Sequence, residues 1–405
     1  MSAGPENQRR LRVLMLNHNV VWRSTFYRAF YFARELADLG HEVTVATISR
    51  DRVFRAKTYE LEKVRIVETP DWGVSLARTG WDPWDTFFRC RKFLAETFDL
   101  VHGFDCRPVV LTPSLVLARR RGIPWVSDWA DCWGGPGGAI SQRKSWVGRV
   151  AFRPLETWLE EGFRHRARAV TVTSRLLEQR AQDLGLPRER IHYLPSGANV
   201  RTVSVRESAE CRRSLGLDAD RPVACFVGFV QYDLELVIRA FAVARGKVPR
   251  ALLVLVGPPN RNAQRLIDDL GLRPDVREFG TRPFEEIPTF LGAADVLLLP
   301  LSDNLMNRAR GPIKLGDYLA AGRAIVANPT GDLVEIFGRD EVGLLAGETP
   351  AAYGAAMAGL LGDRDRSRAM GRTARAVAEN RYAWSLGAPA LVDVYRRSLE
   401  GPPGP

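Results

Sequence analysis

Several cations lie close together in one short polar stretch of the chain, between two apolar runs. Arg308, Arg310 and Lys314 occur there, and an Arg side chain can hold a phosphate through two parallel hydrogen bonds. Asp317 follows about one helical turn later. A carboxylate repels phosphate, so we expect Asp317 to face hydroxyl groups, such as those of a ribose. These residue types predict a site for a phosphorylated ligand with hydroxyls. The alternative is an ordinary surface helix behind a solvated basic loop.

The elements around this stretch would place it at one edge of a sheet. Residues 296–299 form an almost wholly apolar run, which is typical of a strand buried on both faces of a parallel sheet. Residues 302–311 form a polar loop. Pro312 then opens a helix that Gly322 closes, since Pro is favoured at the first helical position and Gly just beyond the last. Residues 324–327 are the next predicted strand.

The start of that helix predicts an anion site. Ligands of open α/β sheets bind outside the carboxyl ends of the strands. The free amides of Ile313, Lys314 and Leu315 would point at such a ligand. The helix dipole favours negative charge there, although it contributes only about 0.3–2 kcal/mol. The cationic side chains therefore have to supply most of the attraction.

The chain has 405 residues, which is enough for two or three domains of about 100–200 residues each. No run approaches the roughly 18 apolar residues of a membrane-spanning helix. The first residues lack the apolar core and cleavage site of a signal peptide, because the first apolar run is itself a predicted strand. We expect a cytoplasmic protein, and a peripheral position at the inner face of a membrane stays an open alternative.

The five cysteines are scattered and form no Cys-x-x-Cys or Cys/His cluster. This spacing argues against a disulfide framework and against structural zinc. No cluster of metal ligands is evident elsewhere. We therefore expect no essential metal and no cofactor.

The formal net charge is +11. A basic balance suits phosphorylated substrates, an anionic membrane surface or nucleic acid. Acidic residues are interleaved with the arginines nearly throughout, and no nucleic-acid-binding motif is present. We therefore expect no nucleic-acid partner.

The first half of the chain opens with a strand at 12–16, a helix at 25–39 and a strand at 41–47. This is a βαβ unit that begins a Rossmann-like domain. The loop at 17–24 lacks the glycine-rich dinucleotide fingerprint, so binding of NAD or FAD is not expected. Further strands are predicted at 65–68, 99–102, 124–128 and 169–173, and helices at 87–97, 108–121, 142–166 and 175–184.

A second Rossmann-like domain begins after residues 200–220, a polar stretch with little predicted structure. The same alternation of strands and helices follows it. Besides the elements already given, strands are predicted at 223–227, 251–256 and 276–279, and helices at 234–245, 262–270, 283–292, 350–361, 364–380 and 382–399.

Four pieces of the second half match a known family in order and spacing. They are ADVLLLP at 294–300, PIKLGDYLAAGRAIVA at 312–327, GDLVEI at 331–336 and VGLL at 342–345. This part resembles the donor site of family-four glycosyltransferases of the GT-B type. The run from AVTVTS at 169–174 to PSGAN at 195–199 resembles the end of that family's N-terminal domain.

The resemblance implies an α/β fold of the GT-B kind, with two Rossmann-like domains whose parallel sheets face each other across a cleft. Residues 1–199 would form the acceptor-binding domain, and residues 200–381 the domain that binds the nucleotide sugar. Residues 382–405 would form a helix that crosses back to the N-terminal domain, followed by a disordered tail.

The chain departs from this family at positions that usually carry charge. The family has glutamates at the positions of Ala309 and Asp317. It has an Arg and a Lys near the positions of Phe229 and Asp233. The ribose-binding role can pass to Asp317, whereas the cations for the diphosphate have to come from elsewhere.

The resemblance assigns the donor to the C-terminal domain. There Arg310 and Lys314 would stabilise the leaving diphosphate in place of the missing cations, together with Arg308. Further donor contacts are implied at Gly228, Gly280, Thr281, Arg282, Pro312, Ile313, Leu315, Asp317 and Glu335.

The acceptor would lie on the N-terminal domain. Relatives carry a His-x-His pair where His102 ends a predicted strand, and one member contacts the sugar or the reacting centre. Here Phe104 replaces the second histidine. The alternative for His102 is a strand-end histidine whose hydrogen bonds are satisfied within the fold. Acceptor contacts are expected from Asp128, Trp129, Asp131 and Trp133, unless the aspartates are caps and turn residues.

The implied reaction moves a sugar from a nucleotide-diphosphate sugar to a hydroxyl acceptor with retained anomeric configuration. A UDP-sugar is the favoured donor and a GDP-sugar the next. The acceptor would be a saccharide, a lipid-linked saccharide or a small natural product. Two alternatives are a sugar-nucleotide epimerase of the same fold, and a non-catalytic subunit that binds the nucleotide sugar while a partner subunit supplies the missing groups.

The predicted helix at 142–166 mixes basic and apolar residues. Arg143, Lys144, Arg149 and Arg153 are interspersed with apolar and aromatic residues such as Trp146. Such a helix can lie on an anionic membrane surface. It can equally be a helix at the edge of a domain with one buried face.

Overall fold

The computed structural model describes residues 9–401, except 52–53, 75–78, 143–145 and 229–232. The chain divides into two compact units, which are described separately. The first unit comprises Met1–Pro195, Ala309–Gly311 and Trp384–Pro405, and the second comprises Ser196–Arg308 and Pro312–Ala383. The C-terminal tail was expected to be disordered. Its residues after Gly401 lie outside the described part of the chain.

The first unit is built on a sheet of eight strands. These strands are β1 (Arg12–Val20), β2 (Glu42–Ile48), β3 (Lys57–Leu61), β4 (Val64–Thr69), β5 (Leu100–Phe104), β6 (Trp125–Trp129), β7 (Ala169–Val172) and β8 (Ile191–Tyr193). Their order across the sheet is β3-β4-β2-β1-β5-β6-β7-β8. All pairs are parallel except β3 with β4.

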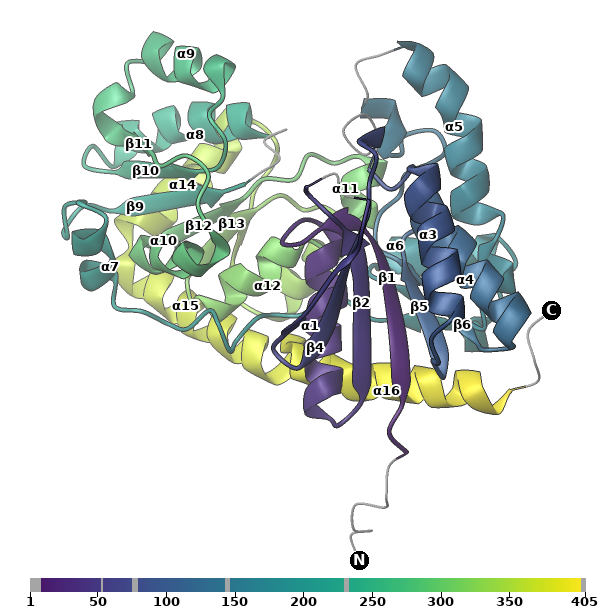
Figure 1. The fold of residues 1–405 in the computed structure, drawn as a ribbon. Helices are drawn as coiled ribbons and strands as arrows, with labels where there is room; N and C mark the ends of the chain where they lie inside the picture. The colour runs from purple at the N-terminus through teal and green to yellow at the C-terminus, as the bar shows by residue number, and fades with distance from the viewer. Residues whose placement is uncertain (1–8, 52–53, 75–78, 143–145, 229–232, 402–405) are drawn as a thin grey trace, which may run out of the picture. The chain divides into compact units, whose positions relative to one another are not determined.

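Helices connect these strands and cover the sheet (Figure 1). They are α1 (Thr25–Asp38), α3 (Pro83–Leu94), α4 (Pro108–Arg121), α5 (Trp146–Glu161), α6 (Arg175–Asp183) and α16 (Trp384–Glu400), with 3-10 turns at Ala139–Gln142, Arg164–Arg166 and Arg188–Arg190. The last helix, α16, returns to this unit and packs on α1. Parallel crossovers are right-handed, so α1 and α3, which lead in opposite directions along the sheet, cover opposite faces.

The second unit has six parallel strands. They are β9 (Val223–Val227), β10 (Leu252–Val256), β11 (Val276–Glu278), β12 (Val296–Leu299), β13 (Ala324–Ala327) and β14 (Gly343–Leu345). Their order is β11-β10-β9-β12-β13-β14. Successive residues of β9 alternate between two apolar clusters, with Cys225 in one and Phe226 in the other. This sheet is therefore buried on both faces, which explains why its strands read as continuous apolar runs.

The helices of the second unit flank this sheet (Figure 1). They are α7 (Ser208–Ser214), α8 (Leu234–Lys247), α9 (Arg261–Asp269), α10 (Ile287–Ala293), α11 (Leu305–Ala309), α12 (Ile313–Ala320), α13 (Leu333–Arg339), α14 (Pro350–Gly362) and α15 (Arg364–Val377), with short turns at Arg273–Asp275, Phe284–Glu286 and Ala378–Tyr382. None of the helices in the described residues is both long and apolar enough to cross a bilayer.

The predicted fold class is confirmed, since both units are α/β sheets of the Rossmann-like kind. Several buried strands have the predicted bounds, as at 296–299 and 324–327. Some strands are longer than predicted, and β1 is the clearest case. β1 continues to Val20, which pairs with Ile48, because its polar residues Asn17 and His18 end the apolar run without ending the strand.

Several short elements are absent from the prediction, among them β3, α7 and α11. β3 is an antiparallel edge strand without a buried side chain, so it has no apolar run to reveal it. α7 lies within the stretch 200–220, where little structure was expected. α11 lies within the predicted loop 302–311 and spans little more than one turn, which is too short to show helical periodicity.

A buried ion pair ties α1 to the sheet of the first unit. The Nε of Arg28 lies 3.0 Å from an Asp128 carboxylate oxygen, and its Nη2 lies 2.9 Å from the other. The same guanidinium donates to the carbonyl of Leu194 at 2.8 Å and to that of Pro195 at 3.2 Å. Thr171 donates its hydroxyl to Asp128 at 2.7 Å. Both charges are fully buried and well bonded.

Removal of Arg28 should leave Asp128 as an uncompensated buried charge. We expect Arg28→Met to lower the free energy of unfolding by about 3–5 kcal/mol. The double variant with Asp128→Leu should recover much of that loss, because no charge stays behind. The measurement is urea-induced unfolding followed by tryptophan fluorescence. Arg9→Ala is the control, since Arg9 pairs with Asp99 at the surface and should cost at most about 1 kcal/mol. Equal losses for Arg28→Met and Arg9→Ala would contradict this account.

Candidate active site

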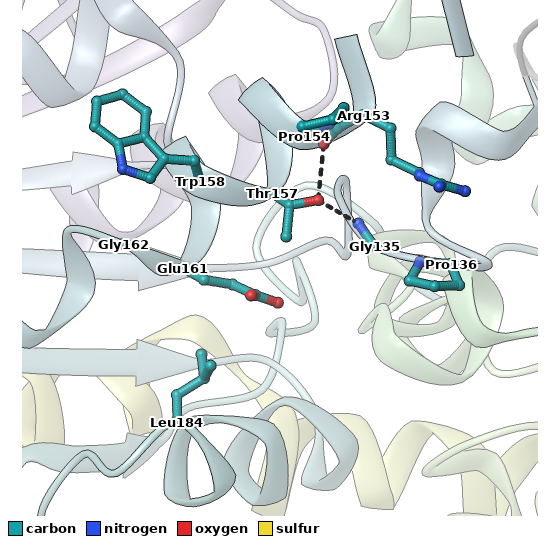
Figure 2. A pocket seen from close by; sticks show the side chains of 9 residues that line it. All are labelled: Gly135, Pro136, Arg153, Pro154, Thr157, Trp158, Glu161, Gly162 and Leu184. Carbon is teal, nitrogen blue, oxygen red and sulfur yellow. Dashed lines mark hydrogen bonds between the residues drawn. The ribbon is translucent and has the colours of Figure 1, made fainter. Parts of the chain in front are cut away.

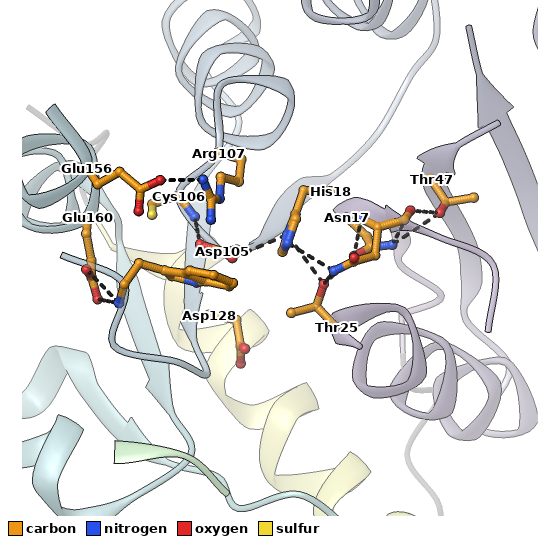
Figure 3. A network of polar contacts seen from close by, with 12 residues as sticks. Asn17, His18, Thr25, Thr47, Asp105, Cys106, Arg107, Asp128, Glu156 and Glu160 are labelled. Carbon is orange, nitrogen blue, oxygen red and sulfur yellow. Dashed lines mark hydrogen bonds and ion pairs between the residues drawn. The ribbon is translucent and has the colours of Figure 1, made fainter. Parts of the chain in front are cut away.

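A buried polar network lies at the carboxyl ends of β1 and β5 in the first unit (Figure 3). His18 on β1 approaches Asp105, just after β5, with 3.3 Å between Nδ1 and Oδ2. Asn17 accepts a hydrogen bond from the hydroxyl of Thr25 at 2.6 Å. Thr25 begins α1, so the network joins the first strand, its crossover helix and β5. This is the edge where α/β proteins bind ligands.

His18 is a neutral imidazole. Burial lowers its pKa to about 4, although the Asp105 carboxylate opposes this shift. Its Nε2 lies 2.9 Å from the Asn19 amide nitrogen, which can only donate. The tautomer in which Nε2 accepts from Asn19 carries its proton on Nδ1, the nitrogen that lies 3.3 Å from Asp105. A neutral histidine oriented by a carboxylate can exchange protons or hold a hydroxyl.

Asp105 adopts a strained backbone conformation, with φ 87°. Its side chain accepts a hydrogen bond from the amide of Cys106. Burial alone would raise the pKa of Asp105, but His18 and Arg107 together lower it below its usual value. Strain of this kind costs about 1–3 kcal/mol and is concentrated at functional sites. Asp105 is therefore held ionised and in place by the surrounding structure.

The loop that follows β6 is anchored by one glutamate of α5. Glu160 is fully buried and accepts hydrogen bonds from Trp129 Nε1 at 2.7 Å and from the Trp133 amide at 3.0 Å. It also accepts one from the amide of Gly134. Three donors converge on this carboxylate, which therefore sets the path of the loop.

Two of the expected acceptor residues are not available to a ligand. Asp128 is bonded to Arg28 and Thr171 and is fully buried, as is Trp129, whose ring lies 4.1 Å from the Arg164 guanidinium. Their assignment as acceptor contacts was wrong, because β6 runs on to Trp129 and both side chains are held inside the sheet. Asp131 and Trp133 lie beyond the strand and are only partly buried. The Trp133 ring lies beside His18 and Arg107.

His102 is also a core residue. It is fully buried, and its Nδ1 lies 2.8 Å from the hydroxyl of Tyr395 on α16. Burial lowers the pKa of His102 to about 4. β5 continues to Phe104, so His102 lies within the strand and not at its end. The structure therefore favours a packing role and corrects the expected catalytic one.

Arg310 lies with the first unit, beside the same loop. Its Nε is buried without a hydrogen-bond partner among the described residues and lies 3.9 Å from Asp131. Burial raises the pKa of Asp131 to about 6, against the attraction of Arg310. This pairing is loose, so Arg310 has hydrogen-bonding capacity left for an anion. Lys314, its expected partner at the diphosphate, belongs to the second unit.

In the second unit, α12 begins directly after Pro312, which is its N-cap. Lys314 lies in the first turn, with its ammonium 5.2 Å from the centre of the Phe226 ring at the end of β9. The amide of Leu315 donates to the carbonyl of Pro312 at 2.9 Å, so it is not free as expected. This short first turn leaves Ile313 as the candidate amide for an anion.

Asp317 lies one turn further along α12 and is partly buried. No described residue donates a hydrogen bond to its carboxylate. Burial raises the pKa of Asp317 to about 7. A ligand hydroxyl that donates to this carboxylate would offset the cost of its burial. The arrangement fits the hydroxyl-binding role that its position suggested.

Close backbone contacts hold α12 and its neighbouring turn in place. A Cβ on Gly316 would lie 2.2 Å from the carbonyl oxygen of Gly197. A Cβ on Gly331, which has φ 55°, would lie 2.8 Å from the carbonyl of Arg308. Glycine inside a helix costs about 0.5–1 kcal/mol relative to alanine, so Gly316 is explained by this approach and not by helix propensity.

The other residues expected to contact the sugar donor lie at the edge of the second sheet. They differ in exposure and in whether their polar groups already have hydrogen-bond partners. Arg308 is exposed and paired with Asp303. The amide of Gly228 donates to Val256 at 2.9 Å, and the carbonyl of Gly280 accepts from Gly257 at 3.0 Å. Thr281, Arg282 and Glu335 are exposed. Asp233 accepts from the hydroxyl of Ser302, and Phe229 lies outside the described residues.

Sequence reasoning missed the polar network of His18, Asp105, Arg107 and Glu160. The signal available was a group of polar residues directly after an apolar strand, as in Asn17–Asn19 and Asp105–Arg107. Nothing in the sequence pairs His18 with Asp105, because that contact depends on the order of strands in the sheet.

An open cavity of about 500 Å³ lies beside the loop after β6 (Figure 2). Its wall on α5 includes Arg153, Pro154 and Trp158, and Pro136 and Leu184 line it from the loop and the end of α6. The amide of Gly135 donates to the hydroxyl of Thr157 at 2.7 Å and joins loop and helix. The cavity is mainly apolar. In the part of the chain that the structure describes, no three His, Cys, Asp or Glu side chains gather as metal ligands, and the expected independence of metal stays a prediction.

Both halves of the chain match family models. Residues 28–197 match the model described as glycosyl transferase 4-like domain, and residues 207–377 match that described as glycosyl transferases group 1. The two parallel-sheet units thus define a protein of the two-domain Rossmann-like class. The chain belongs to the family-four-like glycosyltransferases of the GT-B fold.

Two relatives illustrate the likeness in sequence. A D-inositol 3-phosphate glycosyltransferase of Nocardia farcinica is 30% identical over 244 residues, which cover 57% of this chain and 53% of the relative. The alpha-D-kanosaminyltransferase of Streptomyces kanamyceticus is 26% identical over 272 residues, covering 64% and 67%. The chain thus spans about half the length of the first of these relatives.

Solved structures share the fold. A sucrose-phosphate synthase from Thermosynechococcus elongatus has a TM-score of 0.74 at 19% identity, covering 96% of this chain and 99% of that one. Anabaena HepE, in complex with UDP and glucose, has a TM-score of 0.72 at 16% identity, covering 96% and 100%. At these identities the likeness concerns the fold alone.

Removal of Glu160 should loosen the loop after β6. We expect Glu160→Ala to cost about 1.5–3 kcal/mol, since it leaves buried donors without an acceptor. Limited proteolysis should then cut the loop between residues 130 and 138 faster than in the wild type. Glu178→Ala is the control, because Glu178 pairs with Arg175 at the surface. Unchanged proteolysis in Glu160→Ala would show that the loop does not depend on this carboxylate.

The raised pKa of Asp317 predicts a pH-dependent stability. The unfolded carboxyl has a pKa near its usual value of 3.8, whereas burial raises the pKa of the folded one to about 7. Above pH 4 the unfolded state therefore releases this proton more readily, so Asp317 lowers stability progressively up to about pH 7. Asp317→Asn should raise the thermal unfolding temperature at pH 8 but not at pH 4. One pKa unit corresponds to about 1.4 kcal/mol, so the gain is a few kcal/mol at most. An equal change at both pH values would refute this explanation.

Proposed function

We propose that this protein is a retaining glycosyltransferase that moves a sugar from a nucleotide-diphosphate sugar to a hydroxyl acceptor. The observation that carries the proposal is the first part of α12. Lys314 provides a cation at the start of this helix, and Asp317 provides a partly buried carboxylate without a donor among the described residues. A phosphate followed by a ribose supplies the complementary charge and hydroxyls.

The donor would bind at the carboxyl edge of the second sheet. Its ribose hydroxyls would donate to Asp317, and its diphosphate would accept from Lys314 and the amide of Ile313. Residues of the loop after β11, Gly280 to Arg282, lie at the same edge and suit contacts to the base. A UDP-sugar is the preferred donor and a GDP-sugar the next. The likeness to HepE, which was solved with UDP and glucose, supports this order.

The acceptor would bind at the polar network of the first unit. Asp131 and Trp133 are the partly exposed residues there, beside the neutral His18. An aromatic face suits a sugar ring, and a carboxylate suits its hydroxyls. A saccharide, a lipid-linked saccharide or a small natural product satisfies these requirements. One relative is named for D-inositol 3-phosphate, a polyol, which agrees with a hydroxyl acceptor.

The anomeric configuration can be retained without a covalent enzyme intermediate. The buried carboxylates agree with this, because they are engaged by other side chains. Asp128 is held by Arg28, and Asp105 faces His18, so neither is free to attack a sugar. The leaving diphosphate would then take the acceptor proton itself. Lys314 and the first amide of α12 would stabilise the negative charge that develops on that group, which is the largest electrostatic demand of the step. Arg310, in the first unit, also has unused hydrogen-bonding capacity for an anion.

A non-catalytic subunit that binds the nucleotide sugar is the second candidate. The replacement of the family's usual Lys by Asp233, and the pairing of Arg308 with Asp303, favour it. In that case a partner subunit would supply the missing cations. The comparisons favour neither this subunit nor the epimerase over a transferase. A cytoplasmic location stays a prediction in each case.

Nucleotide binding is the direct test of the donor site. We expect UDP to bind, and Lys314→Ala to weaken it about 10–100-fold, as for loss of a hydrogen bond to a charged group. Calorimetry with UDP, GDP, ADP and TDP gives the base preference. Lys247→Ala is the control, since Lys247 lies in the last turn of α8, at the opposite end of its helix from the carboxyl edge. If none of these nucleotides binds, or if Lys314→Ala binds as the wild type does, the assignment to α12 fails.

Transfer itself separates the candidates. The purified protein is incubated with UDP-glucose and a panel of hydroxyl acceptors, and UDP release and the anomeric configuration of the product are measured by NMR. A product with retained configuration supports the proposal. Nucleotide binding without UDP release favours the binding subunit, and a free sugar-nucleotide epimer without an acceptor favours the epimerase.

A further inference from the structure

The helix α5 is inverted relative to an ordinary surface helix. Its carboxylates point inward, where Glu156 pairs with Arg107 at 2.7 Å and Glu160 holds the loop after β6. Both glutamates are almost fully buried. A helix that packs on a domain normally buries its apolar stripe and exposes its charges. α5 therefore does have one buried face, as the alternative of a domain-edge helix expected, but that face carries the two glutamates.

The exposed side of α5 is apolar. Trp146 is 68% exposed and Trp158 is 56% exposed, and Val150, Phe152 and Leu155 are exposed as well. These residues extend along nearly the whole helix. Single exposed apolar residues are common, but a continuous row of this size marks an interaction surface.

A second aromatic group lies next to this row. Trp72 and Phe54 are both largely exposed, and their ring centroids lie 5.8 Å apart. Trp72 stacks on Trp84 at 5.4 Å, and Trp84 contacts Phe87. These residues come from the loops that flank β3 and β4 and from the start of α3. The exposed surface therefore includes aromatic rings from several elements of the first unit.

Trp81 connects the two groups. It lies in the loop between Trp72 and Trp84, and its ring meets that of Phe152 on α5 edge to face, with centroids 6.4 Å apart. The row on α5 and the aromatic group thus form one apolar region, which we call the aromatic face. It is defined by Phe54, Trp72, Trp84, Phe87, Trp146, Val150, Phe152, Leu155 and Trp158.

The sequence of the first part of α5 and of the segment before it carries charge of one sign. Residues 132–155 contain no Asp or Glu but include Arg143, Lys144, Arg149 and Arg153. Arg153 is exposed, and its side chain extends toward Pro136 and away from Trp158 (Figure 2). The next acidic residues on α5 are neutralised, since Glu156 pairs with Arg107 and Glu161 pairs with Arg180. Apolar and basic groups therefore occur together, without exposed carboxylates among the described residues of α5.

We infer that the aromatic face docks on an anionic lipid bilayer, with α5 lying in the plane of its headgroups. Helices that combine tryptophan, phenylalanine and basic residues bind such interfaces, where the rings enter the headgroup region and the cations meet lipid phosphates. Basic residues near an anionic leaflet add to the attraction, which falls with salt. This inference is independent of the transfer reaction, because it uses none of the residues assigned to donor or acceptor.

Vesicle binding tests the inference. The full chain is sedimented with vesicles of phosphatidylcholine alone and with vesicles that also contain phosphatidylglycerol. We expect binding to the anionic vesicles that weakens as salt is raised. The variant Trp146→Ser with Trp158→Ser should bind at least about tenfold more weakly, since it removes two large apolar side chains. Arg153→Glu should weaken binding to anionic vesicles only.

A matched control uses exposed apolar residues elsewhere in the first unit. Leu39→Ser with Leu386→Ser changes two residues of similar exposure that lie just after α1 and on α16, and not on α5. This variant should bind vesicles as the wild type does. Lipids brominated near the headgroup should quench the fluorescence of the wild type more than that of Trp146→Phe with Trp158→Phe.

Several results would overturn the inference. They are absence of binding to anionic vesicles at low salt, an equal loss in the α5 and control variants, and binding that depends on net charge alone. Stoichiometric binding of a single-chain amphiphile without vesicle binding would instead identify the cavity of Figure 2 as a site for an apolar tail. Formation of a dimer that buries the tryptophans would identify a second copy as the occupant. Nucleotide binding should be unchanged in every variant, so failure here is distinct from failure of the donor site.

Discussion

The ion pair between Arg28 and Asp128 is the interaction on which the first unit's site depends. Burial of each ion costs several kcal/mol, and only a complete set of hydrogen bonds offsets that cost. The set is complete here, because Thr171 and the carbonyls of Leu194 and Pro195 join the pair. These groups come from α1, β6, β7 and the segment after β8. The pair therefore fixes the strand ends beside which the polar network of His18 forms.

The fold could be predicted from the sequence to a large extent, for a physical reason. Strands buried on both faces need continuous apolar side chains, so β12 and β13 were found with their observed bounds. The same rule fails for β3, whose side chains are exposed or half-buried. It also fails at the end of β1, where polar residues satisfy hydrogen bonds inside the network and keep the strand conformation.

The site was less predictable, because it depends on contacts between distant residues. Asp317 could be found, since a helix start after a buried strand is a local pattern. His102, Asp128 and Trp129 were chosen from predicted strand ends, but β5 and β6 extend far enough to hold them inside the sheet. Which face of α5 is buried could not be predicted from the sequence either. Its sequence shows two faces, and only the loop amides that need Glu160 decide which one is buried.

The net charge of +11 does not by itself show which cations can bind an anion at the site, because some arginines already have acidic partners. Arg308 pairs with Asp303, so part of the positive charge is already compensated. Arg310 differs, because its buried Nε has no hydrogen-bond partner among the described residues and the nearby Asp131 has a pKa raised to about 6. An unsatisfied buried donor costs about 1–3 kcal/mol, and an anion that accepted from it would remove that cost. The capacity to bind an anion therefore lies where an arginine is incompletely paired, and not where arginines are most numerous.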